Sequence, residues 1–490
     1  MIQNKKLEIG KFILDNISIG MYNNPLMLYR EYIQNSVDSI DEICCTKHFR
    51  KNHTKIEINI DGRNRKILIK DNGAGIKAEN AWATLFNIGK SNKLVSINRG
   101  FRGIGRLGGI GYCDELRFKT KAIGENIYTE SIWDTKRLRE IINNSSISEN
   151  TTDIIKEVTE FEQKQYTGQL KDHFFIVEMH NVSSIKDICL DVPEVKSYIS
   201  QVAPVPFDSN KFSFSEQIEK KLKENVPLYN IYNISVNGEQ IFKPYKDDIN
   251  ITSKLKDEIK DVDFFEFKNE EEYLAFGWIA KLQFLGSINR SNLFDCIRVR
   301  CGNIQVGDKN LLSEFFREER FNNYLIGELY ITNNKLIPNS RRDDFEYNLY
   351  KEKLYISFIK EIGIPYSKRI RDASEKRSNT KLKNREFDIK QEALHIIQDG
   401  YYSENQKKKV INDLIRFKKG IDNLNDNTEI NNLIENVNNT KFYFEKNHNK
   451  IKRKDKDRFK KILETIYDSC CDKSEAQKVI NNIIKKDIFN

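Results

Sequence analysis

The chain has 490 residues and a formal net charge of +9. Its length favours two to four domains, each able to bury a core of its own. It has no apolar run as long as a membrane span, its N-terminus MIQNKKLEIGKF lacks a signal-peptide core, and its eight cysteines show neither a disulfide framework nor metal-ligand spacing. These features exclude a membrane protein and a disulfide-rich secreted domain, and we expect a cytoplasmic protein.

The first informative segment, LYREYIQNSVDSIDE, starts at Leu28 and predicts an amphipathic helix. Its polar residues share one face at positions i, i+4, i+7 and i+11: Glu31, Asn35, Asp38 and Glu42. Apolar residues repeat this spacing on the opposite face, which would pack on a sheet. A carboxylate one turn before a carboxamide suits a water-activating base beside a metal ligand, so Glu31 and Asn35 are candidate site residues. In an isolated helix, the same pattern would more often be a solvated polar face.

The next segment, KIEINIDGRNRKILIKDNGAGI, predicts a β-hairpin because apolar residues alternate on both sides of Asp61-Gly62. The hairpin delivers Asp71 at the end of its second strand, and Gly73 and Gly75 follow in the turn. An ionised carboxylate only accepts hydrogen bonds, so Asp71 can fix an exocyclic amine such as that of adenine. Glycines beside it allow a flat base to approach the backbone.

The third segment, GFRGIGRLGGIG, is rich in glycine. Its Gly103-x-Gly105-x-x-Gly108 matches the dinucleotide-binding pattern, but it follows the polar stretch NIGKSNKLVSINR instead of the first strand of a βαβ unit. A lid whose backbone amides close over phosphates fits better, and a strand should follow it. Candidate phosphate-binding glycines are Gly103, Gly105, Gly108, Gly109 and Gly111, and candidate cations are Lys90, Arg102 and Arg106.

Together these segments resemble the GHKL superfamily of ATP-binding proteins, which includes gyrase, MutL, histidine kinases and the ninety-kilodalton heat-shock chaperones. The chaperones are the most similar, since Lys90-Ser91 stands where they carry a Lys-Ser pair ahead of the lid. The resemblance implies an ATP site that uses Mg²⁺. In it Glu31 would be the general base for water, Asn35 the magnesium ligand, and Asp71 the adenine ligand. Further ATP-binding residues would be Asp38, Gly73, Gly75, Lys90, Ser91 and the lid residues named above.

The resemblance continues beyond the nucleotide domain. CIRVRCGNI at 296–304 is similar to a strand of the chaperone middle domain, and KLIPNSRRD at 335–343 is similar to the segment whose arginine reaches the γ-phosphate. A planar guanidinium can bind phosphate bidentately and stabilise phosphoryl transfer. Both Arg341 and Arg342 stay open for this role, and simple alignment slightly favours Arg341. The alternative is a basic turn capped by the two following aspartates.

One family motif, a late Gly-Thr pair, has no assigned counterpart. The strand that would follow it is expected at 174–179, and the polar stretch 135–169 is expected to be helical and then loop.

The positive charge is concentrated at the C-terminal end. Residues 366–490 hold 29 Lys and Arg against 20 Asp and Glu, and subtracting these from the totals of 81 and 72 leaves 52 of each sign. Apolar spacing in this region favours a small helical bundle or a dimer surface. Basic clusters leave nucleic-acid binding open, although interleaved acids favour a solvated helix face. Helices are expected near 366–398, 403–420, 428–447, 451–468 and 473–487.

We therefore predict an α+β protein of three domains. They are a GHKL (Bergerat) ATPase α/β sandwich over 1–185, an α/β middle domain over 186–365 that completes the ATP site, and a basic all-α C-terminal region over 366–490. The predicted function is an ATP-hydrolysing clamp, similar to the heat-shock chaperones, that is a homodimer and acts on a protein client or partner. Resemblance also extends to ATP-sensing proteins of bacterial antiviral defence. The alternative is a nucleic-acid-associated ATPase, similar to the MORC, MutL and topoisomerase groups, that clamps DNA.

Overall fold

The computed structural model describes residues 10–11, 13–14, 24–45, 54–89, 103–144, 150–269, 272–421, 428–443, 445 and 453–485. The chain divides into two compact units, Met1–Arg371 and Asp372–Asn490. Among the helices of the described ranges, none combines the length and apolar character needed to cross a bilayer.

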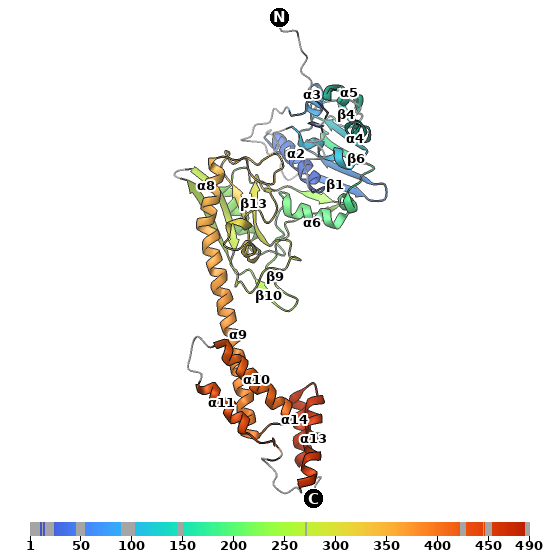
Figure 1. Ribbon diagram of the computed structural model, residues 1–490. Helices are drawn as coiled ribbons and strands as arrows, with labels where there is room; N and C mark the ends of the chain where they lie inside the picture. Colours follow the sequence, from blue (N-terminus) through green and yellow to red (C-terminus); the bar gives the residue numbers. More distant parts are fainter. Residues whose placement is uncertain are drawn as a thin grey trace. The chain divides into compact units, whose positions relative to one another are not determined.

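The first unit begins with an eight-stranded sheet in the order β5-β4-β3-β6-β2-β1-β7-β8 (Figure 1). Its strands are β1 (Ile56–Asp61), β2 (Lys66–Asp71), β3 (Glu115–Lys121), β4 (Ile127–Asp134), β5 (Thr159–Gln165), β6 (Phe174–His180), β7 (Ile234–Val236) and β8 (Glu239–Gln240). All neighbours pair antiparallel except β1 and β7, which are parallel. The predicted hairpin, the strand after the glycines and the strand at 174–179 are all present.

Helices and short 3-10 turns accompany this sheet: α2 (Met27–Cys44), α3 (Ala78–Phe86), η2 (Gly105–Tyr112), α4 (Thr135–Asn143), α5 (Thr151–Glu157), η3 (Ile185–Leu190) and α6 (Val192–Val202). The apolar face of α2 forms as predicted, because Ile33, Val37 and Ile40 are buried in one core with the inward residues of the hairpin. This packing explains why a helix with so many polar residues is stable.

The prediction of a loop in the second part of 135–169 is wrong for one segment. Residues 159–165 form β5, which pairs with β4 at the edge of the sheet. Its sequence TEFEQKQ reads as polar because most of its side chains are exposed, as is common for an edge strand.

A five-stranded sheet follows in the order β11-β12-β15-β13-β14. Its strands are β11 (Val262–Asn269), β12 (Glu272–Ala280), β13 (Cys296–Cys301), β14 (Ile304–Val306) and β15 (Ile326–Ile331), with a separate pair β9 (Asp248–Asn250) and β10 (Lys256–Glu258). The accompanying helices are α7 (Ser215–Asn225), η4 (Ser313–Phe315), η5 (Glu319–Tyr324), α8 (Leu349–Phe358) and the π-turn η6 (Ile359–Gly363). The strand predicted from CIRVRCGNI is β13, and it runs parallel to β15.

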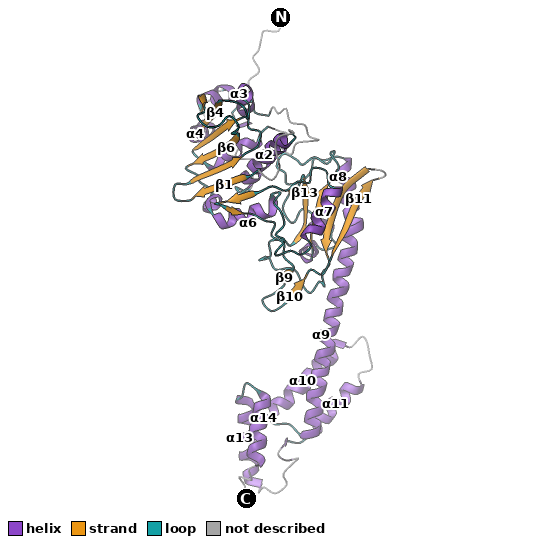
Figure 2. Ribbon diagram, turned by 180° about the vertical axis from the view of Figure 1, so that it is seen from behind, coloured by secondary structure: helices purple, strands orange, loops and turns teal. Residues whose placement is uncertain are grey.

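The second unit is helical in its described residues, as Figure 2 shows by the absence of orange strands there. Its helices are α9 (Ile364–Asp399, which begins in the first unit), α10 (Glu404–Ile421), α11 (Thr428–Asn439), α13 (Arg453–Ser469) and α14 (Lys473–Lys485). Ala393, Val410, Leu414, Leu463 and Ile480 belong to its single core. The predicted α+β class with an all-α C-terminal region is confirmed.

The three predicted domain boundaries stay predictions. The compact units meet after Arg371, and the first sheet takes β7 and β8 from beyond residue 185.

Candidate active site

Glu31 lies buried on α2 between two guanidinium groups. Its Oε1 is 3.3 Å from Nη2 of Arg30 and 3.7 Å from Nε of Arg342. Its Oε2 faces Gly105, where a Cβ would lie only 2.6 Å away. A side chain at position 105 would therefore displace the Glu31 carboxylate from this position.

The arginine turn, residues 339–344, brings Arg342 rather than Arg341 against Glu31. Arg342 is 7% exposed, whereas the side chain of Arg341 is exposed and its backbone oxygen accepts a 3.1 Å bond from Arg30 Nη2. Burial lowers the pKa of Arg342, and the neighbouring Glu31 opposes that change. The backbone of Arg342 has φ of +57°, a left-handed conformation that is uncommon outside glycine and is concentrated at functional sites. The structure therefore makes Arg342 the stronger candidate of the two.

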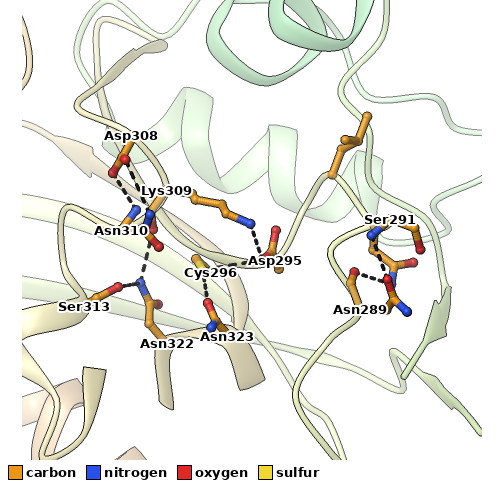
Figure 3. Close-up of polar contacts among 12 residues, drawn as sticks. Asn289, Ser291, Asp295, Cys296, Asp308, Lys309, Asn310, Ser313, Asn322 and Asn323 are labelled. Carbon is orange, nitrogen blue, oxygen red and sulfur yellow. Dashed lines mark hydrogen bonds and ion pairs between the residues drawn. The ribbon is translucent and has the colours of Figure 1, made fainter. Parts of the chain in front are cut away.

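The loop that follows β14 holds the arginine turn in place. Gly307 N donates to Arg342 O at 2.8 Å, and a Cβ on Gly307 would lie 2.9 Å from Asp343 O. The loop is itself fixed to the start of β13 by the 2.6 Å ion pair of Lys309 with Asp295, and Asn322 donates to Lys309 O (Figure 3). The position of Arg342 is thus set by the second sheet.

Asp71 is buried at the end of β2 and is oriented through both of its oxygens. Ser36 on α2 donates its hydroxyl to Oδ2 at 2.8 Å, and Gly73 N donates to Oδ1 at 2.9 Å. The turn behind Asp71 needs its glycines. Gly75 has φ of +66° and would place a Cβ 2.1 Å from Lys121 O.

Residues 103–112, which we call the glycine segment, lie against α2 and include η2. Gly108 and Gly109 are buried, and Gly111 is half-buried. Arg106 donates from Nε to Leu85 O and from Nη2 to Asn87 O, at the end of α3, and burial lowers its pKa to about 10. Arg106 thus connects the glycine segment to the end of α3, a role that the sequence did not indicate. Its predicted contact with phosphate stays a prediction.

The remaining predicted residues divide into three groups. Asn35 is half-buried and Asp38 is buried, both on the face of α2 that carries Glu31, whereas Glu42 is exposed beyond them. Lys90, Ser91 and Arg102 lie outside the described residues.

Sequence reasoning missed several residues around this site. Arg30 and Tyr198 lie close to Glu31, and burial raises the pKa of Tyr198 to about 12. His173, which precedes β6, donates from Nδ1 to Gly73 O at 2.6 Å. It stands where the unassigned Gly-Thr motif was sought, and its position just ahead of the predicted strand was the available signal.

Residues 29–167 match the family described as histidine kinase-, DNA gyrase B-, and HSP90-like ATPase. With the sheet and the helix that carries Glu31, this match defines an ATPase domain of the GHKL class.

Among proteins with such a domain, the chain is similar to the chaperone protein HtpG. It is 28% identical over 213 residues to HtpG of Rickettsia akari, a match that covers 38% of this chain and 32% of the relative. HtpG of Rickettsia rickettsii gives 28% over 210 residues with the same coverage, and HtpG of Rickettsia typhi gives 28% over 164 residues, 29% of this chain and 26% of the relative. The chain thus spans about a third or less of the length of these curated relatives. The predicted resemblance to the GHKL ATPases and the heat-shock chaperones is confirmed for the N-terminal part.

Proposed function

We propose that this protein is an ATP-hydrolysing conformational clamp that acts on a protein client or partner. The observation that carries the proposal is the meeting of Glu31 on α2 with Arg342 from the arginine turn, 3.7 Å apart and beside Gly105. A base on α2, which packs against the first sheet, and a cation from the arginine turn, which is held by the loop after β14, can come together around a γ-phosphate. Binding and hydrolysis of ATP would then change how these two parts of the first unit are held.

In the proposed mechanism, Asp71 accepts a hydrogen bond from the adenine amine and backbone amides of the glycine segment bind phosphate oxygens. Glu31 takes a proton from the water that attacks the γ-phosphorus, and the bond from that phosphorus to the bridging oxygen breaks, so that ADP leaves. The Arg342 guanidinium stabilises the charge on the transferred group. The described residues contain no group of three or more His, Cys, Asp and Glu that could hold a metal by themselves. Mg²⁺ held by nucleotide phosphates, with the Asn35 amide oxygen as its protein ligand, would neutralise phosphate charge.

Asp71→Asn should weaken ATP binding by about 10- to 100-fold, because an amide nitrogen replaces one acceptor and a charge-assisted bond to the adenine amine is lost. Isothermal titration calorimetry measures this change directly. Asp61→Asn is the matched control, since Asp61 is an exposed carboxylate at the other end of the same hairpin. Unchanged affinity in a folded Asp71→Asn protein would remove Asp71 from the site.

Arg342→Ala should lower kcat by about 100-fold or more while changing ATP affinity little, because a cation that meets the γ-phosphate acts mainly in the transition state. Arg341→Ala is the control, since it removes an exposed side chain and keeps the backbone oxygen that Arg30 contacts. Steady-state phosphate release at saturating ATP compares the two. The opposite ranking would assign the role to Arg341, as the alignment suggested.

We also propose that the protein forms a homodimer through residues 366–490 and acts in a bacterial antiviral defence system. The second candidate function, clamping of DNA, is favoured by one observation, the net charge of +9 that lies wholly after residue 365.

Light scattering on the full chain and on a chain ending at Arg371, together with titration of duplex DNA at two salt concentrations, separates these candidates. We expect the full chain to be a dimer and the truncated chain to be a monomer. We also expect the full chain to bind duplex DNA weakly at both salt concentrations chosen, about 50 and about 200 mM. A monomeric full chain whose DNA affinity falls steeply between those two salts would favour the DNA clamp, because released counterions make such binding salt-dependent.

A further inference from the structure

The side chain next to Glu31 makes two hydrogen bonds with the glycine segment. Tyr32 on α2 is 2% exposed, and its ring belongs to the core beneath the helix. Its hydroxyl donates to Arg106 O at 3.0 Å and accepts a bond from Gly109 N at 3.0 Å. One hydroxyl therefore satisfies a backbone acceptor and a backbone donor three residues apart.

The second of these contacts requires glycine at position 109. A Cβ there would lie 2.6 Å from the Tyr32 hydroxyl oxygen, and 3.3 and 3.4 Å from the side-chain ends of Leu116 and Met179. The hydroxyl is the closest of the three obstacles. Tyr32 and Gly109 are thus fitted to one another.

Arg106 is fixed both at its backbone carbonyl and at its guanidinium group. Tyr32 bonds its carbonyl, and its guanidinium bonds the carbonyls of Leu85 and Asn87 at the end of α3. The preceding residue, Gly105, is the one that faces Oε2 of Glu31. The contacts of Tyr32 therefore set the distance between the glycine segment and the carboxylate on the adjoining residue of α2.

We propose that Tyr32 is a positioning residue that fixes the glycine segment against the base on α2, so that phosphate-binding amides and Glu31 keep one geometry during hydrolysis. The inference rests on the proposed function for its catalytic consequence, because small displacements of positioned groups reduce turnover strongly. In the proposed site adenine is bound elsewhere, by Asp71, so the consequence should fall on kcat and hardly on the KM for ATP.

Tyr32→Phe tests the proposal because it removes the hydroxyl and keeps the buried ring. We expect kcat to fall about tenfold, with the KM for ATP changed less than about twofold. Tyr29→Phe is the matched control. Tyr29 lies on the same helix and is buried, but its hydroxyl donates to Cys189 O in η3 and not to the glycine segment. An equal loss of kcat in both variants would reduce Tyr32 to a general structural role and overturn the proposal.

A double variant adds a rescue. Gly109→Ala alone should lower kcat, because its methyl group meets the Tyr32 hydroxyl. With Tyr32→Phe also present the methyl gains room, so the double variant should match Tyr32→Phe alone rather than show both losses. Additive losses would contradict the fitted pair.

Hydrogen exchange separates this inference from the proposed function. Amides in peptides that cover 105–112 should exchange about tenfold faster in Tyr32→Phe than in Tyr29→Phe, with no need for turnover. A wild-type chain without ATPase activity would defeat the proposed function, and exchange would still decide the inference. Equal exchange in the two variants would overturn it.

Discussion

Glu31→Ala should abolish ATP turnover and leave ATP binding close to the wild-type value. The substitution removes the proposed acceptor for the proton of the attacking water, a contribution of about 10²- to 10⁴-fold in rate. It keeps Asp71, the proposed adenine ligand, and Asn35, the proposed magnesium ligand. Phosphate release at saturating ATP and calorimetric titration of ATP measure the two effects separately.

The surroundings of Glu31 decide how this result must be controlled. Alanine takes a carboxylate away from Arg30 and Arg342, which are both buried, so the variant should also lose stability. Glu31→Gln keeps the shape of the side chain and one of its oxygens. It therefore shows the effect of losing the base without the larger loss of stability expected for alanine. Glu42→Ala is the control on the same helix, because Glu42 is exposed. Wild-type hydrolysis by a folded Glu31→Gln protein would refute the assignment of the base.

Local periodicity was sufficient to predict the elements that carry the site. The spacing of Ile33, Val37 and Ile40 predicted the buried face of α2, and alternation around Asp61 predicted the β1–β2 hairpin. Each of these patterns is contained within about twenty residues of sequence. The helices of the second unit were predicted for the same reason, although α11 ends at Asn439 and not near 447.

The parts that sequence could not give depend on contacts between distant residues. Whether Arg341 or Arg342 turns inward depends on the left-handed backbone at Arg342 and on Gly307, which no short pattern encodes. The second task of Arg106 depends on the end of α3, about twenty positions earlier in the chain. β7 joins β1 as a parallel neighbour although it has three residues and lies far along the chain.

Of the substitutions proposed here, replacement of Glu328 on β15 should cause the largest loss in the free energy of unfolding. It is fully buried beside two cations: both of its oxygens bond Lys243 Nζ, at 3.0 and 2.8 Å, and Oε1 also bonds Arg300 Nε. Burial raises the pKa of Glu328, but Arg300 and Lys243 outweigh that effect and lower it to about 2. Glu328→Gln would take the carboxylate away from the buried Arg300 guanidinium and from Lys243, so we expect a loss of about 3–5 kcal/mol in the free energy of unfolding, measured in urea.

Lys243→Met is the matched comparison, because it removes the second cation and leaves Arg300 and Glu328 as a balanced pair. Burial, reinforced by Arg300 and opposed by Glu328, lowers the pKa of Lys243 to about 7. In the unfolded chain a lysine keeps its proton up to about pH 10.4. Between these values the unfolded state binds more protons, so the contribution of Lys243 to stability should rise with pH from about 7 to about 10. The contribution of Glu328 should be lost as pH falls from about 4.5 towards 2.

Unfolding of the wild type, Glu328→Gln and Lys243→Met at pH 7 and pH 9 tests both statements. At pH 7 we expect Lys243→Met to lose much less free energy of unfolding than Glu328→Gln. Between pH 7 and pH 9 the free energy of unfolding of Lys243→Met should rise less than that of the wild type, because the contribution of Lys243 is missing. That asymmetry follows from charge balance, since the cluster holds two potential cations and one anion in a fully buried place. Equal destabilisation by the two substitutions would mean that packing, and not charge balance, decides the stability of this cluster.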